Sequence, residues 1–130
     1  MPDLPALQTA GAIALCGALG CLARYWLSGW VYAWAGRLFP WGTFAVNVVG
    51  AFLIGLLMEF ALRSTLISPT LRIALTIGFL GGLTTFSSFS YETFRLLEEG
   101  AFITAATNVL ASVLVCLVFT WFGIYTARHL

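Results

Sequence analysis

Charge is scarce in this sequence, and lysine is missing altogether. Only 8% of the 130 residues are charged, whereas 61% are hydrophobic; a soluble domain carries roughly a quarter charged residues. The six basic residues are all arginine and are scattered along the chain, so no basic patch is available for nucleic acid. There is too little charge to cover a surface that faces water. The composition therefore excludes an ordinary soluble domain and predicts an integral membrane protein.

Histidine and cysteine are also too few, and too widely separated in the sequence, to form a hydrolase, disulfide or zinc site. The one histidine, His129, lies at the C-terminal end, so a serine hydrolase inside the membrane would have no general base. Cys16, Cys21 and Cys116 fall inside apolar segments without CxxC spacing. We interpret them as small packing residues and predict neither a disulfide nor a zinc site. The sequence thus predicts a protein that is not an enzyme.

Four long hydrophobic stretches are present, at residues 7–27, 43–62, 71–94 and 101–126. Each is long enough to cross a hydrocarbon core of about 30 Å, which takes roughly 20 residues of helix. In lipid the backbone must satisfy its own hydrogen bonds, so these segments are predicted to be helices. No positive segment precedes the first stretch, so we interpret it as a retained helix and not as a signal peptide. The prediction is one all-α domain over residues 1–130, in the plasma membrane or bacterial inner membrane.

The predicted connections are short, at residues 26–41, 64–70 and 97–100. The first is rich in tryptophan and tyrosine, which favour the membrane interface. With four spans, three arginines fall on each side of the membrane: Arg63, Arg72 and Arg128 against Arg24, Arg37 and Arg95. The side richer in arginine and lysine normally stays cytoplasmic, so this tally favours neither orientation. It predicts insertion in both orientations and pairing as an antiparallel homodimer.

Polar groups concentrate in the third stretch, where residues 81–94 read Gly-Gly-Leu-Thr-Thr-Phe-Ser-Ser-Phe-Ser-Tyr-Glu-Thr-Phe. A lipid-facing helix does not tolerate so many polar groups, so this face is predicted to line a partner helix or a wet path. The paired Gly81 and Gly82 favour a break in the helix. Phe86 and Phe89 are three residues apart and are predicted to share a face, where their positive ring edges can stabilise a small anion. The alternative is that the hydroxyls bond to their own helix and the rings only fill space.

Isolated polar residues elsewhere admit two interpretations. Asn47 can donate its amide hydrogens to an anion or to a neighbouring helix. Glu59 with Arg63, and Glu92 with Arg95, have the spacing of local charge pairs on a helix.

The sequence resembles the Fluc, or CrcB-type, family of fluoride channels over essentially its whole length. The resemblance rests on Gly-Gly-Leu-Thr-Thr-Phe-Ser-Ser-Phe-Ser at residues 81–90, followed by Glu92. Two further motifs are similar to those of the family: Gly-Cys-Leu-Ala-Arg at residues 20–24, and Trp-Gly-Thr-Phe-Ala-Val-Asn-Val-Val-Gly at residues 41–50.

The resemblance implies an antiparallel, dual-topology homodimer with two passive fluoride pathways. It assigns ring edges to Phe86 and Phe89 and an amide donor to Asn47. The polar track that it implies consists of Thr85, Ser88, Ser112 and Glu92. A structural sodium ion at the dimer centre would be held by the backbone carbonyls of Gly81 and Thr84, and Arg24 would lie near a pore mouth or the dimer contact. Cys116 stands where we expect a serine in relatives, and a thiol is a weaker donor than a hydroxyl.

Two other functions are compatible with four helices. A small proton-coupled multidrug exporter needs a membrane carboxylate in its first helix, and residues 7–27 contain none. A subunit that only assembles with others would use the polar cluster for packing. We expect the partners of the chain to be a second copy of itself, fluoride and lipid.

Overall fold

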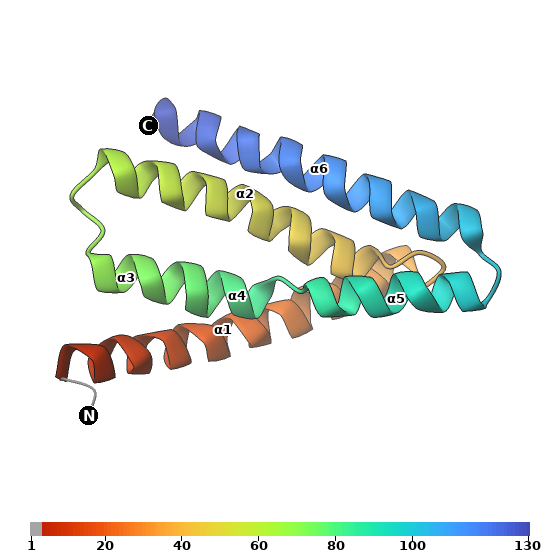
Figure 1. Ribbon diagram of the computed structural model, residues 1–130, viewed down its shortest axis with the longest axis horizontal. Coiled ribbons are helices and arrows are strands. Elements are labelled where there is room, and N and C mark those ends of the chain that lie inside the picture. The colour runs from red at the N-terminus through yellow and green to blue at the C-terminus, as the bar shows by residue number, and fades with distance from the viewer. Residues whose placement is uncertain (1–3) are drawn as a thin grey trace.

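The computed structural model describes residues 4–130, which form helices joined by short turns (Figure 1); residues 1–3 of the predicted domain lie outside this description. Four segments are long and apolar enough to span a membrane: Pro5–Ala35, Trp41–Arg63, Pro69–Glu98 and Phe102–Arg128. The prediction of an all-α protein with four membrane helices is therefore confirmed.

The third span is interrupted, whereas the other three are continuous helices. The continuous ones are α1 (Leu4–Ala35), α2 (Trp41–Arg63) and α6 (Phe102–Arg128). The third consists of α3 (Pro69–Ile73), the π-helix η1 (Ala74–Leu80), α4 (Gly81–Leu83) and α5 (Phe86–Glu98). The break predicted for the third helix is confirmed, and it lies after the glycine pair instead of at it.

The first helix is longer than predicted. Residues 26–35, which we assigned to an aromatic connector, are the last turns of α1, and the turn occupies only residues 36–40. No proline interrupts residues 26–35, and the isolated Gly29 is tolerated within the helix. Gly36 adopts a positive φ of 79°, and its N–H donates to the Tyr32 carbonyl, which closes the helix. Tyr32 is consequently a helical residue with a fixed direction.

Glycines allow the helix backbones to touch at two crossings. Between α2 and α6, a Cβ on Gly55 would collide with the Thr120 carbonyl, and one on Gly123 with the Phe52 carbonyl. Where α1 crosses η1 and α4, a Cβ on Gly20 would collide with the Phe79 carbonyl. Small residues bring membrane helices into direct van der Waals contact in this way.

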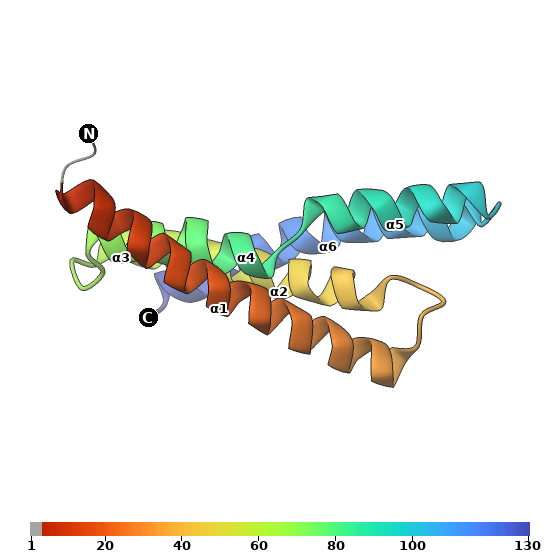
Figure 2. The ribbon, with the colours of Figure 1, turned by 90° about the horizontal axis from the view of Figure 1, so that it is seen from below.

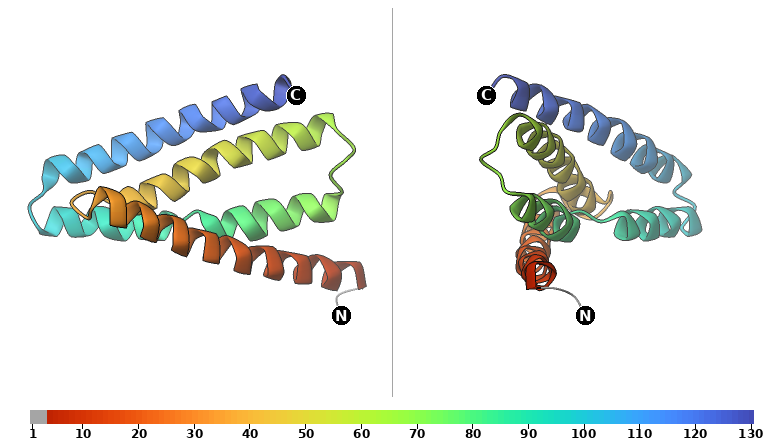
Figure 3. Two further views of the ribbon diagram at one scale, coloured as in Figure 1. Left: turned by 180° about the vertical axis from the view of Figure 1, so that it is seen from behind. Right: turned by 60° about the vertical axis from the view of Figure 1, so that its left-hand side comes forward.

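The molecule divides into two branches at the end that carries the first and third turns. Figure 2 shows α1 and α2 diverging there from α5 and α6, and the right-hand view in Figure 3 shows α5 projecting away from the rest. The apolar core of Val46, Leu80 and Leu83 lies before this division. No residue of α5 is fully buried, and hydrogen bonds at Glu92 and Thr93 join this helix to its neighbours.

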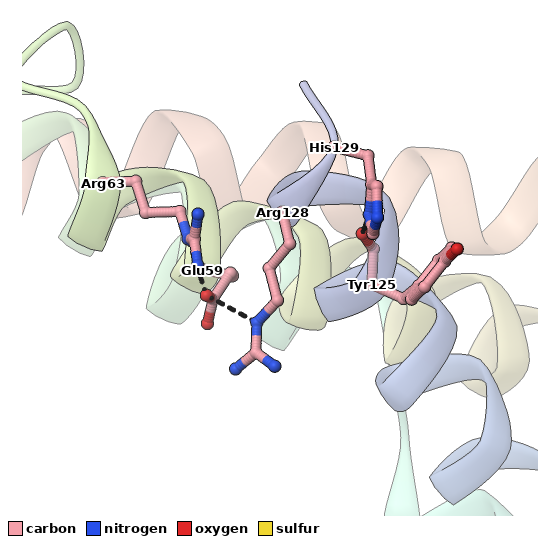
Figure 4. A network of polar contacts seen from close by, with 5 residues as sticks. All are labelled: Glu59, Arg63, Tyr125, Arg128 and His129. Atoms are coloured by element: carbon pink, nitrogen blue, oxygen red, sulfur yellow. Dashed lines mark hydrogen bonds and ion pairs between the residues drawn. The ribbon is translucent and has the colours of Figure 1, made fainter.

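At the opposite end a shared carboxylate joins α2 to α6 (Figure 4). Oε1 of Glu59 accepts hydrogen bonds from Nε of Arg63 and Nε of Arg128, each at 2.9 Å. Beside this pair, the His129 ring packs on the Tyr125 ring with centroids 4.2 Å apart. The predicted pairing of Glu59 with Arg63 is confirmed, and Arg128 makes it a network of three residues.

Candidate functional site

The break in the third span is held open by one side chain of α2. Thr84 and Thr85 have extended backbones, with ψ values of 158° and 114°. The Asn47 amide pairs with Thr85 as a neighbouring strand would: Oδ1 accepts the Thr85 N–H at 2.8 Å, and Nδ2 donates to the Thr85 carbonyl at 3.0 Å. Asn47 therefore satisfies backbone groups that would otherwise be unpaired at membrane depth.

This pairing changes the hydrogen-bond partners of the backbone carbonyls before the break. In a continuous helix the Thr85 N–H would donate to the Gly81 carbonyl, four residues back, but it donates to Asn47 instead. The Thr84 carbonyl accepts a hydrogen bond of 3.3 Å from Nη1 of Arg24, which reaches across from α1. Arg24 and Asn47 thus hold the break from two different helices.

A cavity of about 400 Å³ lies beside the break, between α2, α5 and α6. Of the residues predicted for the site, it is lined by Asn47, Thr84, Thr85, Phe86, Phe89 and Ser112. Cys116 also lines it, together with Thr120, which sequence reasoning did not single out. Ser88, Glu92, Arg24 and Gly81 are not among its lining residues.

The two phenylalanines lie side by side at the cavity, as predicted. Their ring centroids are 5.3 Å apart and the ring planes are inclined at 48°. Phe86 is 78% exposed in the single chain. A ring so exposed, at membrane depth, presents its edge and face to whatever covers this side of the molecule.

The hydroxyl groups at the start of α5 partly serve the helix itself. Thr85 is the N-cap: its Oγ1 accepts the Ser88 N–H at 3.2 Å and donates to the Ser88 hydroxyl at 3.1 Å. Ser90 and Thr93 donate to carbonyls one turn back in α5. The local interpretation therefore holds for those two hydroxyls, whereas Thr85 both caps α5 and lines the cavity.

Glu92 connects the two branches of the molecule. Its Oε1 accepts hydrogen bonds from Tyr32 Oη at 3.1 Å and Thr43 Oγ1 at 2.9 Å, while Oε2 is buried and has no hydrogen-bond partner among residues 4–130. The predicted pairing with Arg95 is wrong, because Arg95 bonds instead to Glu98 at 3.0 Å and Glu99 at 3.4 Å. Those two carboxylates follow Arg95 near the turn, whereas Glu92 faces α1 and α2.

A second cavity, of about 210 Å³, opens beside Glu92. Its polar lining includes Tyr32, Arg37, Tyr91 and Arg95. Sequence reasoning missed the contribution of Tyr32, because we placed it in a connector.

Asn108 on α6 is a further polar residue that sequence reasoning missed. It is only 1% exposed, and its Nδ2 donates to Thr93 Oγ1 at 2.9 Å. The Ser112 hydroxyl donates to its Oδ1 at 3.4 Å. Asn108 thus extends the polar groups from the first cavity along the contact between α5 and α6. Asn108 could have been predicted from the sequence, because it is a lone asparagine within an apolar helix, as Asn47 is.

Comparisons with known proteins agree over most of the chain. A family model described as CrcB-like protein, Camphor Resistance (CrcB), matches residues 11–124. A protein of Geobacter metallireducens, named fluoride-specific ion channel FluC, is 79% identical over 95% of this chain and 100% of its own length. Proteins of the same name from Geotalea daltonii and Geobacter sulfurreducens are 71% and 68% identical over the same shares.

Proposed function

The chain belongs to the CrcB family and is a fluoride-specific ion channel of the cell membrane, and we propose that fluoride leaves the cytoplasm passively along the cavity beside the broken third span. The observation that carries this proposal is the convergence of Asn47, Phe86, Phe89 and Ser112 on one cavity from three different helices. These residues supply an amide, two aromatic rings and a hydroxyl where the backbone is already interrupted. We assign no catalytic role to any of them.

The chemistry of these groups suits a small anion with a tightly held hydration shell. Transfer of a bare ion into hydrocarbon costs tens of kcal/mol by an idealised estimate, so donors must replace its water along the route. Conduction also requires that no site hold the ion too strongly. Neutral hydroxyl, amide and ring-edge donors satisfy both conditions. From the cavity, Ser112, Asn108 and Thr93 continue the polar groups between α5 and α6. Ser88 and Glu92 also belong to the proposed polar track on α5, where Glu92 accepts hydrogen bonds from Tyr32 and Thr43 and is not a donor to the ion.

We propose an antiparallel homodimer as the conducting unit. Two observations support it: the even distribution of arginines between the two membrane sides and the exposure of apolar residues on α5, namely Phe86, Tyr91 and Phe94. A second chain would cover these side chains and enclose the cavity. Two copies of opposite orientation would also create the inverted symmetry that many transporters encode in one chain.

A structural sodium ion belongs to the same proposal, and the backbone before the break fits it. The Gly81 carbonyl has lost its usual helical donor to Asn47, and a hard cation prefers oxygen ligands. The Thr84 carbonyl is the second proposed ligand, and it already accepts a hydrogen bond from Arg24. The carbonyl oxygens of Gly81 and Thr84 would coordinate the ion at the dimer centre. Arg24 would fix the orientation of the Thr84 carbonyl through its hydrogen bond.

The direct test is efflux from liposomes that contain the purified protein. We expect rapid loss of trapped fluoride and retention of chloride, each measured with an ion-selective electrode, while protein-free vesicles retain both ions. Retention of fluoride by the protein-containing vesicles would overturn the proposal. Uptake of a lipophilic cation driven by a proton gradient, without fluoride efflux, would indicate an exporter instead.

Asn47→Asp is expected to damage conduction and folding together. Aspartate keeps the acceptor for the Thr85 N–H but removes the donor to the Thr85 carbonyl and adds negative charge at the cavity. An unpaired buried carbonyl costs about 1–3 kcal/mol, and the charge repels an anion. We predict an efflux rate at least about tenfold lower, a penalty of about 1.4 kcal/mol, and a lower melting temperature.

The matched control is Gln8→Glu, the same change of amide to carboxylate at an exposed position of α1. It should leave the efflux rate and the melting temperature unchanged. Equal efflux from the Asn47 and Gln8 variants would show that Asn47 neither holds the break nor faces the ion.

A further inference from the structure

A groove on the outside of the bundle has the features of a lipid-binding site. It has a volume of about 330 Å³ and is lined by Leu53, Leu56, Leu57, Phe60, Leu75, Phe79, Leu80 and Leu130. All of these side chains are apolar, and its volume is at the lower limit of the ~300–1,000 Å³ typical of ligand pockets. The groove runs between α2 and η1, away from the ion cavity. Its interior suits a hydrocarbon chain and offers nothing to an ion.

Arginines flank the end of this groove that faces the membrane surface. Arg72 in α3 precedes the lining residue Leu75 by three positions, and Arg63 in α2 follows the lining residue Phe60 by three positions. Neither arginine lines the groove, and each lies about one helical turn beyond it toward this end of the molecule. The end of α2, the start of α3 and the C-terminus lie together at this end of the molecule (Figure 1).

The side-chain charge at this end is unbalanced. Glu59 is the one carboxylate side chain there within residues 4–130, and it is shared by Arg63 and Arg128 (Figure 4). The Arg72 guanidinium has neither an ion pair nor a hydrogen bond within the same residues. Three arginines against Glu59 and the carboxylate of Leu130, which lines the groove, leave an excess of positive charge beside its mouth.

We propose that this groove binds one anionic phospholipid, with an acyl chain between α2 and η1 and the headgroup phosphate on Arg72. A guanidinium offers a planar set of donors that matches a phosphate group in a bidentate manner. A basic residue near an anionic membrane surface contributes about 1 kcal/mol of attraction, which is about fivefold in affinity. The site does not depend on fluoride conduction.

Native mass spectrometry of the detergent-solubilised protein tests this site. The probes are dioleoyl phosphatidylglycerol and dioleoyl phosphatidylcholine, which differ in headgroup charge and share the same chains. We expect the first phosphatidylglycerol to bind about fivefold more tightly than phosphatidylcholine. Arg72→Gln should abolish this preference by weakening phosphatidylglycerol binding more than phosphatidylcholine binding, because both headgroups carry a phosphate but only phosphatidylglycerol has a net negative charge. Arg72→Lys, which keeps the positive charge, should largely restore the preference.

Two further variants separate the groove from general surface charge. Arg37→Gln removes an arginine at the other end whose side chain, within residues 4–130, has no ion pair or hydrogen bond but lies over the Tyr32 ring at 5.0 Å. This change should leave the lipid preference unchanged. Leu57→Trp, which fills the groove, should weaken binding of both lipids.

Three results would overturn the proposal. One is equal affinity for the two lipids in the unmodified protein. Another is an unchanged preference in Arg72→Gln. The third is a Leu57→Trp protein that loses its dimer mass but binds lipid as before, which would assign the groove to a second copy of the chain.

Discussion

Replacing Phe86 and Phe89 together with isoleucine is expected to lower fluoride efflux by about 100-fold or more. Isoleucine keeps the apolar bulk of the cavity wall but lacks the positive ring edge that can face an anion. A 100-fold fall corresponds to about 2.7 kcal/mol over two sites, a plausible loss for two weak contacts. The rate would be measured in the liposome assay, with dimer mass and helix content confirming that the variant folds.

The matched control for this pair is Phe102→Ile. Phe102 begins α6 and is 65% exposed, but it does not line the cavity. Its replacement should change efflux by less than about twofold, because only a facing ring edge contributes. If the double variant conducted as well as this control, the rings would be mere filling and the route would have to lie elsewhere.

Gly123→Ala is expected to disrupt the pairing of α2 with α6. The added methyl group would collide with the Phe52 carbonyl and approach the Leu56 nitrogen at 2.8 Å. Both atoms belong to backbone, so no side chain can rotate away and the two helices must separate. Overpacking typically costs about 1–3 kcal/mol, and we expect the upper part of that range or more. A lower melting temperature would report the weaker contact between α2 and α6. If the proposed dimer depends on this contact, size-exclusion chromatography would also show a larger monomer fraction.

Gly11→Ala provides the contrast. Gly11 lies in α1 with nothing within 4 Å of an added Cβ, and alanine favours a helix over glycine by up to about 1 kcal/mol in water. This variant should therefore be at least as stable as the unmodified protein. Similar melting temperatures for the two alanine variants would mean that the α2–α6 crossing is looser than its backbone contacts indicate.

The sequence was sufficient for the number and type of the helices, because length and hydropathy determine what can cross a bilayer. It was insufficient for the position of the break. Gly81 and Gly82 remain helical in α4, and the interruption falls at Thr84 and Thr85, where Asn47 supplies the partner. That partner lies 38 residues away in sequence, so local preference alone could not locate it.

The errors around Glu92 have a similar origin. Spacing along one helix suggested Arg95, but the actual partners, Tyr32 and Thr43, come from two other helices. Tyr32 could not be predicted as a partner while α1 was expected to end before it. For the cavity, residue type was a better guide, because amides and clustered hydroxyls are costly in lipid-facing positions.

The sparse packing of α5 has a consequence for the single chain in the membrane before the proposed dimer forms. A newly inserted single chain carries a helix that has hydrogen bonds to its own bundle but, on its apolar side, only lipid as a neighbour. Under the proposed dimer, its missing apolar contacts arrive with a second chain, so the share of chains in which this face is covered rises with the amount of protein in the bilayer by mass action. At low abundance, most copies would leave Phe86 and Phe94 facing lipid and the cavity without its second wall.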